Sequence, residues 1–225
     1  MAAAVLLVVV TVGCAGDPVD VRAVGAAAAG IGPASTTTTS TPPTTIDRGS
    51  VLPVPEPLPA FAFAETPEVV LGNMRIPRLG LDEPLHEGMT LTAINRGPSH
   101  WPGTALPGRF GNVVIAGHRT TYSRPFERLD ELTEGDLVHF ELADGSSATY
   151  RVRDVIVVPE AALGIATQTA AHTLTLFACH PKGSATHRIV AKAQLLDDDG
   201  TPVDDDEALP PVDLGLHDGD EVLYV

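Results

Sequence analysis

The chain has 225 residues, of which 44% are hydrophobic and 4% aromatic, and its formal net charge is -15. This length allows one ordinary domain with tails and argues against two full domains. Residues 197–225 hold eleven Asp and Glu and no Lys or Arg, so the remainder carries 18 acids against 14 bases, a net charge of -4. The sequence has no basic stripe that could neutralise phosphates, which argues against a nucleic-acid partner.

The N-terminal segment, residues 1–16, reads MAAAVLLVVVTVGCAG and is apolar. It is short for a transmembrane helix and suits the core of an export signal, although no positive charge precedes it. Thr11 to Cys14 loosely resembles a bacterial lipobox, which makes Cys14 a candidate lipidation site despite Thr11 in place of an aliphatic residue. A lipid anchor, an uncleaved membrane anchor and free secretion stay open. All three place the rest of the chain outside the cytoplasm.

Residues 17–67 are rich in Pro, Thr and Ala, with eight prolines between Pro33 and Pro67. Such a composition buries too little apolar surface to offset the entropy of ordering, and proline favours an extended backbone. We therefore expect a disordered linker that tethers a domain at a distance from a membrane without packing on it.

Residues 68–196 change to short β-rich runs separated by Gly, Pro and Asp, which predicts one all-β domain. Short connections between the runs favour a closed barrel or a sandwich. The segment LADGSS, residues 142–147, predicts a hairpin, and the apolar spacing in RPFERLDEL, residues 124–132, predicts a short helix. The acidic tail, residues 197–225, is expected to be disordered, with a short strand in DEVLYV as the alternative. The expected strands are residues 73–77, 83–88, 112–118, 137–142, 147–158, 173–179 and 186–195.

Cys179 ends the apolar run TLTLFAC, and the only other cysteine is Cys14 in the targeting segment. Cysteines in an oxidising compartment are normally paired, and a partner within that segment would be bound to the membrane or removed. A lone thiol in an exported protein indicates a reactive group or an intermolecular bond. An inert buried cysteine is the structural alternative.

Two further residues could complete a nucleophilic site. A cysteine nucleophile needs a group that moves a proton, and attack on a carbonyl needs a donor for the oxyanion. The run NVVIAGH ends on His118 as TLTLFAC ends on Cys179, so two strands of one barrel could place both groups at the same rim. The segment HPKGSAT can reverse the chain and would bring Arg188 beside the sulfur. Arginine stays cationic and donates several hydrogen bonds.

His118, Cys179 and Arg188 in this order, with TLTLFACHPKGSATHRIV close to a TLxTCxP…R pattern, resemble a bacterial sortase. The resemblance spans roughly Met74 to Leu195, and the phrases AGHRTTYSRPF and CHP are most similar to class E sortases of actinobacteria. It implies a closed sortase-type β-barrel of about seven to eight strands with one or two short helices, and no cofactor or metal. Ala178 departs from the Thr that is common in the family before the cysteine.

The resemblance implies a cysteine transpeptidase whose nucleophile, Cys179, cleaves a C-terminal sorting signal between Thr and Gly through a thioacyl intermediate. His118 would protonate the leaving amine, and Arg188 would hold the oxyanion. The amine of lipid II or another peptidoglycan precursor would then release the product. For class E, the partners would be secreted proteins with an LAXTG-like signal, and Tyr122 would contact the position before X. The expected substrate-binding residues are Thr120, Thr121, Tyr122 and Ala178.

Other interpretations stay open at this point. The L,D-transpeptidases also use a cysteine on peptidoglycan, but they carry a compact SHGC-like motif, and NlpC-type peptidases place the cysteine before the histidine. A sortase-like module that binds sorting signals with weak or no catalysis is a second alternative. A zinc module is the non-enzymatic one, although CxxC spacing is missing. Its ligands would be His172, Cys179, His180 and His187.

Overall fold

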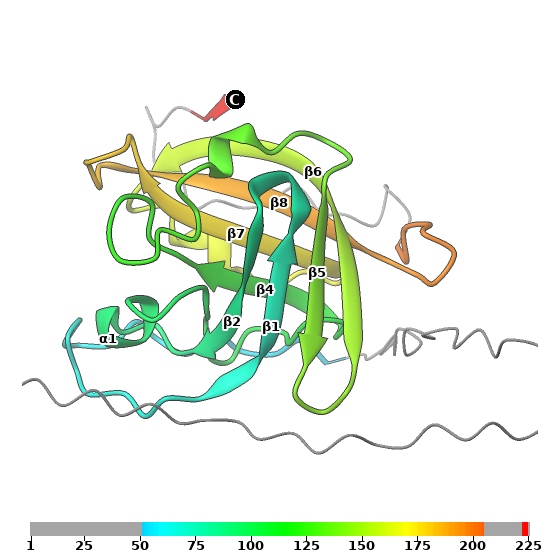
Figure 1. Ribbon diagram of the computed structural model, residues 1–225, viewed down its shortest axis with the longest axis horizontal. Coiled ribbons are helices and arrows are strands. Elements are labelled where there is room, and N and C mark those ends of the chain that lie inside the picture. Colours follow the sequence, from blue (N-terminus) through cyan, green and yellow to red (C-terminus); the bar gives the residue numbers. More distant parts are fainter. Residues whose placement is uncertain (1–50, 205–221, 225) are drawn as a thin grey trace, which may run out of the picture. The chain divides into compact units, whose positions relative to one another are not determined.

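The computed structural model describes residues 51–204 and 222–224, and their strands form a closed β-barrel (Figure 1). The expected export signal with Cys14 and most of the expected linker lie outside the described residues. Within the described part, no helix is long and apolar enough to cross a membrane.

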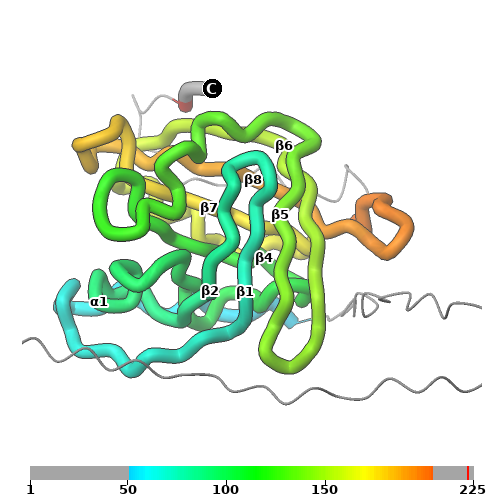
Figure 2. The backbone as a smooth tube through the Cα atoms, in the orientation of Figure 1, coloured from blue at the N-terminus to red at the C-terminus, as the bar shows by residue number. Residues whose placement is uncertain are grey.

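Eight strands form the ring, in the order β5-β1-β2-β3-β4-β7-β8-β6, and a β5–β6 pairing closes it. The path of the chain around this ring can be followed in Figure 2. The strands are β1 (Val70–Ile76), β2 (Leu81–Glu87), β3 (Ser99–His100), β4 (Gly111–Ala116), β5 (Leu137–Leu142), β6 (Ser147–Pro159), β7 (His172–His180), β8 (His187–Leu196) and β9 (Leu223–Tyr224). The expected all-β barrel is therefore confirmed, and every strand expected from the sequence is present. The short β9 adds to β6, as the alternative for the C-terminus anticipated.

The helical elements differ from the prediction. The segment expected to be a helix, residues 124–132, consists of turns and one 3₁₀ turn, η2 (Leu129–Glu131). Arg124 has a φ of 51°, and the Phe126 N–H donates to the His118 carbonyl, so the chain cannot wind into an α-helix there. The apolar spacing in this segment reflects burial of Phe126 and Leu129 in the core. The helices elsewhere are α1 (Leu91–Ile94) and the 3₁₀ turns η1 (Pro77–Leu79) and η3 (Leu163–Ala166).

Side chains alternate between the two faces of β7, which decides what the strand presents to each side. Leu174, Leu176 and Ala178 are buried in the barrel core. The intervening Phe177 and Cys179 are only partly buried and line a cavity outside the core. The same strand thus contributes to stability with one face and carries a thiol on the other.

Residues 51–67, which we call the N-terminal strap, lie against the barrel, in contrast to the expected disordered linker. The Glu56 N–H donates to the Pro102 carbonyl at 2.9 Å, and the Trp101 indole N–H donates to the Glu56 carbonyl at 2.8 Å. The Leu91 N–H donates to the Ala62 carbonyl at 2.6 Å. The prolines of the strap restrict the backbone before folding, which reduces the entropy lost when it docks.

The first part of the expected acidic tail is also ordered. Residues 197–204 turn back on the barrel, where Pro202 bridges to Leu196. The Asp204 carboxylate accepts the His172 backbone N–H at 2.5 Å and lies 3.0 Å from its Nδ1 atom. Acidic side chains here close turns and bind the start of β7, which composition alone does not reveal.

Candidate active site

The parallel pairing of β4 with β7 brings together two segments that are distant in the sequence. Ala116 pairs with Phe177, and the Gly117 N–H donates to the Phe177 carbonyl at 3.1 Å. His118 and Cys179 each follow two residues beyond this pair, so both side chains emerge at the same end of neighbouring strands. The expectation that both lie at one rim is met, although β4 ends at Ala116 and His118 begins the following loop.

The antiparallel β7–β8 hairpin places Arg188 directly opposite Cys179 in the ladder. Side chains of directly opposed residues point to the same face, with Cβ atoms about 4.5–5.5 Å apart. The connecting turn contains a Ser184 N–H that donates to the Pro181 carbonyl at 2.9 Å. The chain reversal expected from HPKGSAT thus produces the expected neighbours.

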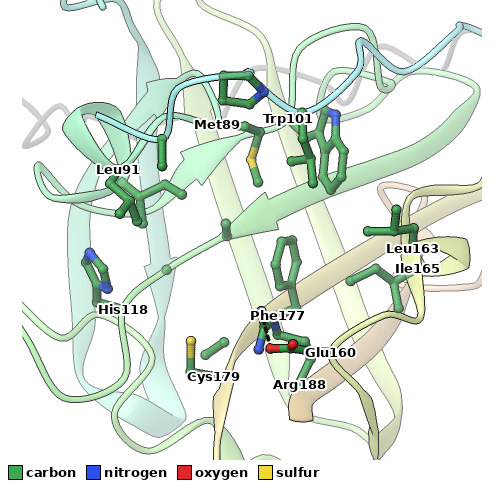
Figure 3. A pocket seen from close by; sticks show the side chains of 17 residues that line it. Met89, Leu91, Trp101, His118, Glu160, Leu163, Ile165, Phe177, Cys179 and Arg188 are labelled. Atoms are coloured by element: carbon green, nitrogen blue, oxygen red, sulfur yellow. Dashed lines mark ion pairs between the residues drawn. The ribbon is translucent and has the colours of Figure 1, made fainter. Parts of the chain in front are cut away.

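One cavity of about 370 Å³ contains all three of these groups. Figure 3 shows Met89 and Trp101 on the opposite side of the cavity from Cys179 and Arg188. The walls are mainly apolar, which suits an extended peptide with hydrophobic side chains. The lining residues come from the strap, from α1, β4, β7 and β8, and from the segments that precede α1 and follow β3, β4 and β6. They are Leu58, Pro59, Ala62, Met89, Leu91, Ile94, Trp101, Ala116, Gly117, His118, Glu160, Leu163, Ile165, Phe177, Ala178, Cys179 and Arg188.

The imidazole of His118 is held by two neighbours. Its Nε2–H donates to the Asn95 side-chain oxygen at 2.7 Å, which fixes the tautomer and leaves Nδ1 as the acceptor of the neutral ring. The Tyr122 ring stacks on it with centroids 5.2 Å apart. Burial lowers the pKa of His118 from its ordinary value of 6.5, so the neutral form dominates at pH 7.

Gly117 sets the path of the backbone into His118. A Cβ atom at this position would lie 2.5 Å from the Phe126 ring, so no side chain fits. Phe126 is fully buried, and its N–H donates to the His118 carbonyl at 3.1 Å. The loop after His118 therefore folds back over the preceding glycine and clamps the histidine backbone.

The Arg188 guanidinium is oriented by backbone oxygens and one carboxylate. Its Nη1 donates to the Ala185 carbonyl at 2.6 Å and to the His187 carbonyl at 2.9 Å. Its Nη2 lies 3.8 Å from the Glu160 carboxylate, whose side chain is 59% exposed. This ion pair is drawn as a dashed line in Figure 3. An exposed pair of this kind is weak, so Arg188 can turn hydrogen bonds toward a substrate.

The four residues predicted to bind substrate differ in how they lie relative to the cavity. Tyr122 is 63% exposed and reaches the site by stacking on His118. Ala178 lines the cavity, but its side chain belongs to the barrel core, so the strand geometry turns only its backbone toward the cavity. Thr120 and Thr121 are exposed and do not line the cavity.

Several site residues escaped the sequence analysis. Asn95 follows α1 in a segment without a recognisable motif, and only the fold brings it to His118. Leu58 and Pro59 belong to the strap, whose composition predicted disorder. Glu160 could have been suspected, because a lone acidic residue after the apolar run DVIVVP is poorly explained by packing.

The proposed zinc ligands are not gathered in one place. His172 begins β7 and is bound to Asp204, whereas His180 ends the same strand. Across residues 51–204 and 222–224, no group of three or more His, Cys, Asp or Glu side chains could hold a metal ion.

A thiol, an imidazole and a guanidinium lie together at one rim of a closed β-barrel, and these are the groups that cysteine-dependent acyl transfer requires. Residues 74–196, more than half of the chain, match the family model described as the sortase domain. The chain belongs to the sortase family.

Individual relatives agree with this assignment. The chain is 29% identical over 110 residues to sortase D of Bacillus subtilis, covering 49% of this chain and 54% of that protein. The chain therefore spans about half the length of the curated relative it matches. The structure of Streptococcus agalactiae sortase C1 is similar with a TM-score of 0.53 and 27% identity, covering 57% of this chain and 70% of that one. The structure of a Clostridium perfringens sortase D5 transpeptidase is similar with a TM-score of 0.52 and 26% sequence identity. The match covers 56% of this chain and 79% of that one.

Proposed function

We propose that the protein is a cysteine transpeptidase that cleaves a C-terminal sorting signal between Thr and Gly and joins the acyl part to an amine. The observation that carries this proposal is the pairing of Cys179 with Arg188 on one face of the β7–β8 hairpin, at a cavity that His118 also lines. These groups supply a nucleophile, an oxyanion donor and a proton carrier. Membership of the sortase family supports the same reaction class.

In the first half-reaction, the Cys179 thiol gives its proton to the His118 imidazole, and the sulfur bonds to the threonine carbonyl carbon. Arg188 donates hydrogen bonds to the oxyanion that forms. The C–N bond to glycine then breaks, the imidazolium gives its proton to the departing amine, and a thioester remains on Cys179. In the second half-reaction, the incoming amine attacks the thioester, its surplus proton passes to His118, and the C–S bond breaks to restore the thiol.

We further propose a class E type preference for LAXTG-like over LPXTG-like signals. Alanine has a backbone N–H that proline lacks, so a hydrogen-bond acceptor at the rim would favour alanine. The exposed Tyr122 hydroxyl is the candidate acceptor, because its ring is stacked on His118 at the edge of the cavity. Tyr122→Phe should reduce the preference for LAXTG over LPXTG while leaving the cleavage of LPXTG unchanged.

The cellular setting is also part of the proposal. The apolar residues 1–16 would anchor the protein to the outer side of the cell membrane, either through lipidation of Cys14 or as an uncleaved anchor. Its partners would then be secreted proteins with LAXTG-like signals and the amine of lipid II or peptidoglycan. Cell fractionation with and without Cys14→Ala would separate the two kinds of anchor.

The direct test is to incubate the protein with an LAXTG peptide and analyse the peptide that carries Cys179 by mass spectrometry. We expect a mass increase equal to the LAXT acyl group, and a hydroxamate product when hydroxylamine is added as the nucleophile. Cys179→Ala serves as the control and should give neither. If the wild-type protein leaves the peptide uncleaved, or if the alanine variant cleaves it equally well, the proposed function is wrong.

A further inference from the structure

A second pair of side chains links the same two segments behind the cavity. Arg119 follows His118, and His180 follows Cys179. Arg119 is only 3% exposed, and its Nη1 donates to the His180 Nδ1 atom at 2.6 Å. Its Nη2 lies 2.8 Å from the Asp130 carboxylate. The two members of the link are 61 residues apart in sequence and adjacent in space.

The position of this link is informative because the β4–β7 ladder ends just before it. The last backbone hydrogen bond between the two segments runs from the Gly117 N–H to the Phe177 carbonyl. Among the described residues, no backbone hydrogen bond joins residues 118–120 to residues 178–181. The Arg119–His180 bond is therefore the next direct tie between the segments that carry His118 and Cys179.

The link is poorly explained as a stabilising feature. The Arg119 Nε atom and the Asp130 Oδ1 atom are buried without a hydrogen-bond partner in the described part of the chain. Buried polar atoms without a hydrogen-bond partner lower the stability of a fold. What an arginine with fixed fork geometry provides instead is a defined direction toward two partners at once.

We propose that Arg119 and His180 are positioning residues that fix the His118 imidazole relative to the Cys179 sulfur. The inference rests on the proposed roles of His118 and Cys179 and adds a requirement for keeping them aligned. Neither positioning residue lines the cavity, so both act through their neighbours and do not touch substrate. Misplacing reacting groups by about 1 Å can lower a rate roughly 10²-fold, so loss of the single hydrogen bond at this point should lower kcat.

The link requires a neutral His180. Arginine can only donate, so His180 Nδ1 must accept and cannot carry a proton. The charged and titratable groups that face His180 are Arg119, His187 and Asp130, with Lys182 acting on Asp130. Burial, followed by Arg119 and His187, lowers the pKa of His180, while Asp130 opposes this change. The surroundings therefore favour the protonation state that the link needs.

The test compares His180→Ala with His180→Asn in the full chain. The Asn side-chain oxygen lies close to where the histidine Nδ1 was and can still accept from Arg119. We expect His180→Ala to lower kcat for LAXTG cleavage by about 10- to 100-fold with KM changed less than about threefold, since binding is retained and alignment lost. His180→Asn should restore most of kcat. Lys182→Arg changes a side chain in the same turn and keeps the charge that acts on Asp130, so this control should behave as wild type.

A second arm asks whether the effect passes through His118. In a His118→Ala background, the additional His180→Ala change should have no further effect on the residual rate, because nothing remains to be aligned. If His180→Ala lowers that residual rate by its full factor, or if His180→Asn is as impaired as His180→Ala, the two residues do not act by positioning His118.

A third arm needs no peptide substrate and is therefore independent of the proposed function. Iodoacetamide alkylation of Cys179 is followed against pH by mass spectrometry of the Cys179 peptide, which separates it from Cys14. In the wild type we expect a step in the plot of alkylation rate against pH, and His118→Ala should remove this step. His180→Ala should weaken this step and His180→Asn should keep it. A step unchanged in His180→Ala, or absent from the wild type, would overturn the inference. Failure of LAXTG cleavage alone would overturn only the proposed function.

Discussion

Cys179 and Arg188 are direct partners across the β7–β8 ladder. Their side chains share the outer face of the hairpin because opposed residues in an antiparallel pair point the same way. The register thus fixes the separation of the thiol and the guanidinium without help from a loop. A shift of one residue would turn one of them into the barrel core.

The first prediction concerns the shape of the Arg188 head group. Arg188→Lys should lower kcat/KM on the order of 10²-fold or more, comparable to the loss of an oxyanion donor. Lysine keeps the charge but cannot bind the Ala185 and His187 carbonyls and still present a planar fork to a substrate. Steady-state cleavage of an LAXTG peptide measures this effect. Near-normal turnover of the lysine variant would show that only the charge of Arg188 matters.

The second prediction concerns Cys179 itself. Cys179→Ala should abolish cleavage while shifting the melting temperature little, since the side chain is only partly buried and faces the cavity. Calorimetry and the peptide assay on the same sample measure both properties. Residual activity of a tenth or more would identify another nucleophile.

The third prediction is the pH dependence. Catalysis by a thiolate and an imidazolium requires His118 to hold a proton while Cys179 has lost one. Burial lowers the pKa of His118 below 6.5, so the acidic limb of a bell-shaped kcat/KM profile should have its midpoint below 6.5. An acidic limb centred above 6.5 would contradict a His118 pKa that burial lowers.

The fourth prediction concerns Asn95, which the sequence did not reveal. Asn95→Ala removes the oxygen that accepts from His118 Nε2–H and frees the ring to rotate or change tautomer. We expect kcat to fall by about 10-fold or more, within the range that general acid–base catalysis contributes, with little change in KM. Asn95→Asp retains an acceptor and should raise the pKa of His118, which would move the acidic limb to higher pH. Equal kcat in the alanine variant would mean that Tyr122 stacking alone orients His118.

The fifth prediction concerns the strap. A chain that begins at Val51 should keep the melting temperature and peptide activity of the full protein, whereas one that begins at Glu68 should lose stability and bind peptide differently. The shorter chain lacks the Leu58 and Pro59 wall of the cavity and leaves the Trp101 indole N–H without its partner. Trp101→Phe removes that one hydrogen bond and provides a milder comparison. If the two shortened chains have the same melting temperature and peptide activity, the strap acts only as a tether.

The barrel was predictable because its strands carry clear signals. Short β-rich runs separated by Gly, Pro and Asp marked the strands, and the LADGSS turn marked the β5–β6 hairpin, whose strands pair antiparallel. The prediction from apolar spacing failed at residues 124–132. Phe126 and Leu129 are buried at helical spacing, but a positive φ at Arg124 and a long-range backbone bond divert the chain. Local spacing reports burial more reliably than conformation when turns follow one another closely.

The core of the site was predictable for a different reason. The apolar runs NVVIAGH and TLTLFAC end on His118 and Cys179, and the turn-forming segment HPKGSAT indicated that Arg188 returns beside them. Asn95 could not be found, since its contact depends on where α1 lies in three dimensions. Disorder was predicted for the strap because its composition offers little apolar surface to offset the entropy lost on ordering. Its prolines have already restricted the unfolded chain, so a few hydrogen bonds and apolar contacts hold it.

The parallel pairing of β4 with β7 determines when in folding the site first exists. Parallel neighbours cannot be joined by a tight turn, and here the connection includes β5, β6 and η3. Such non-local pairings form only after a large loop has closed. A chain whose synthesis stops before β7 lacks Cys179, and a full chain that is still unfolded has this thiol without the His118 imidazole or the Arg188 guanidinium beside it. Under the proposed function, acylation of Cys179 by a sorting peptide would therefore report that folding is complete.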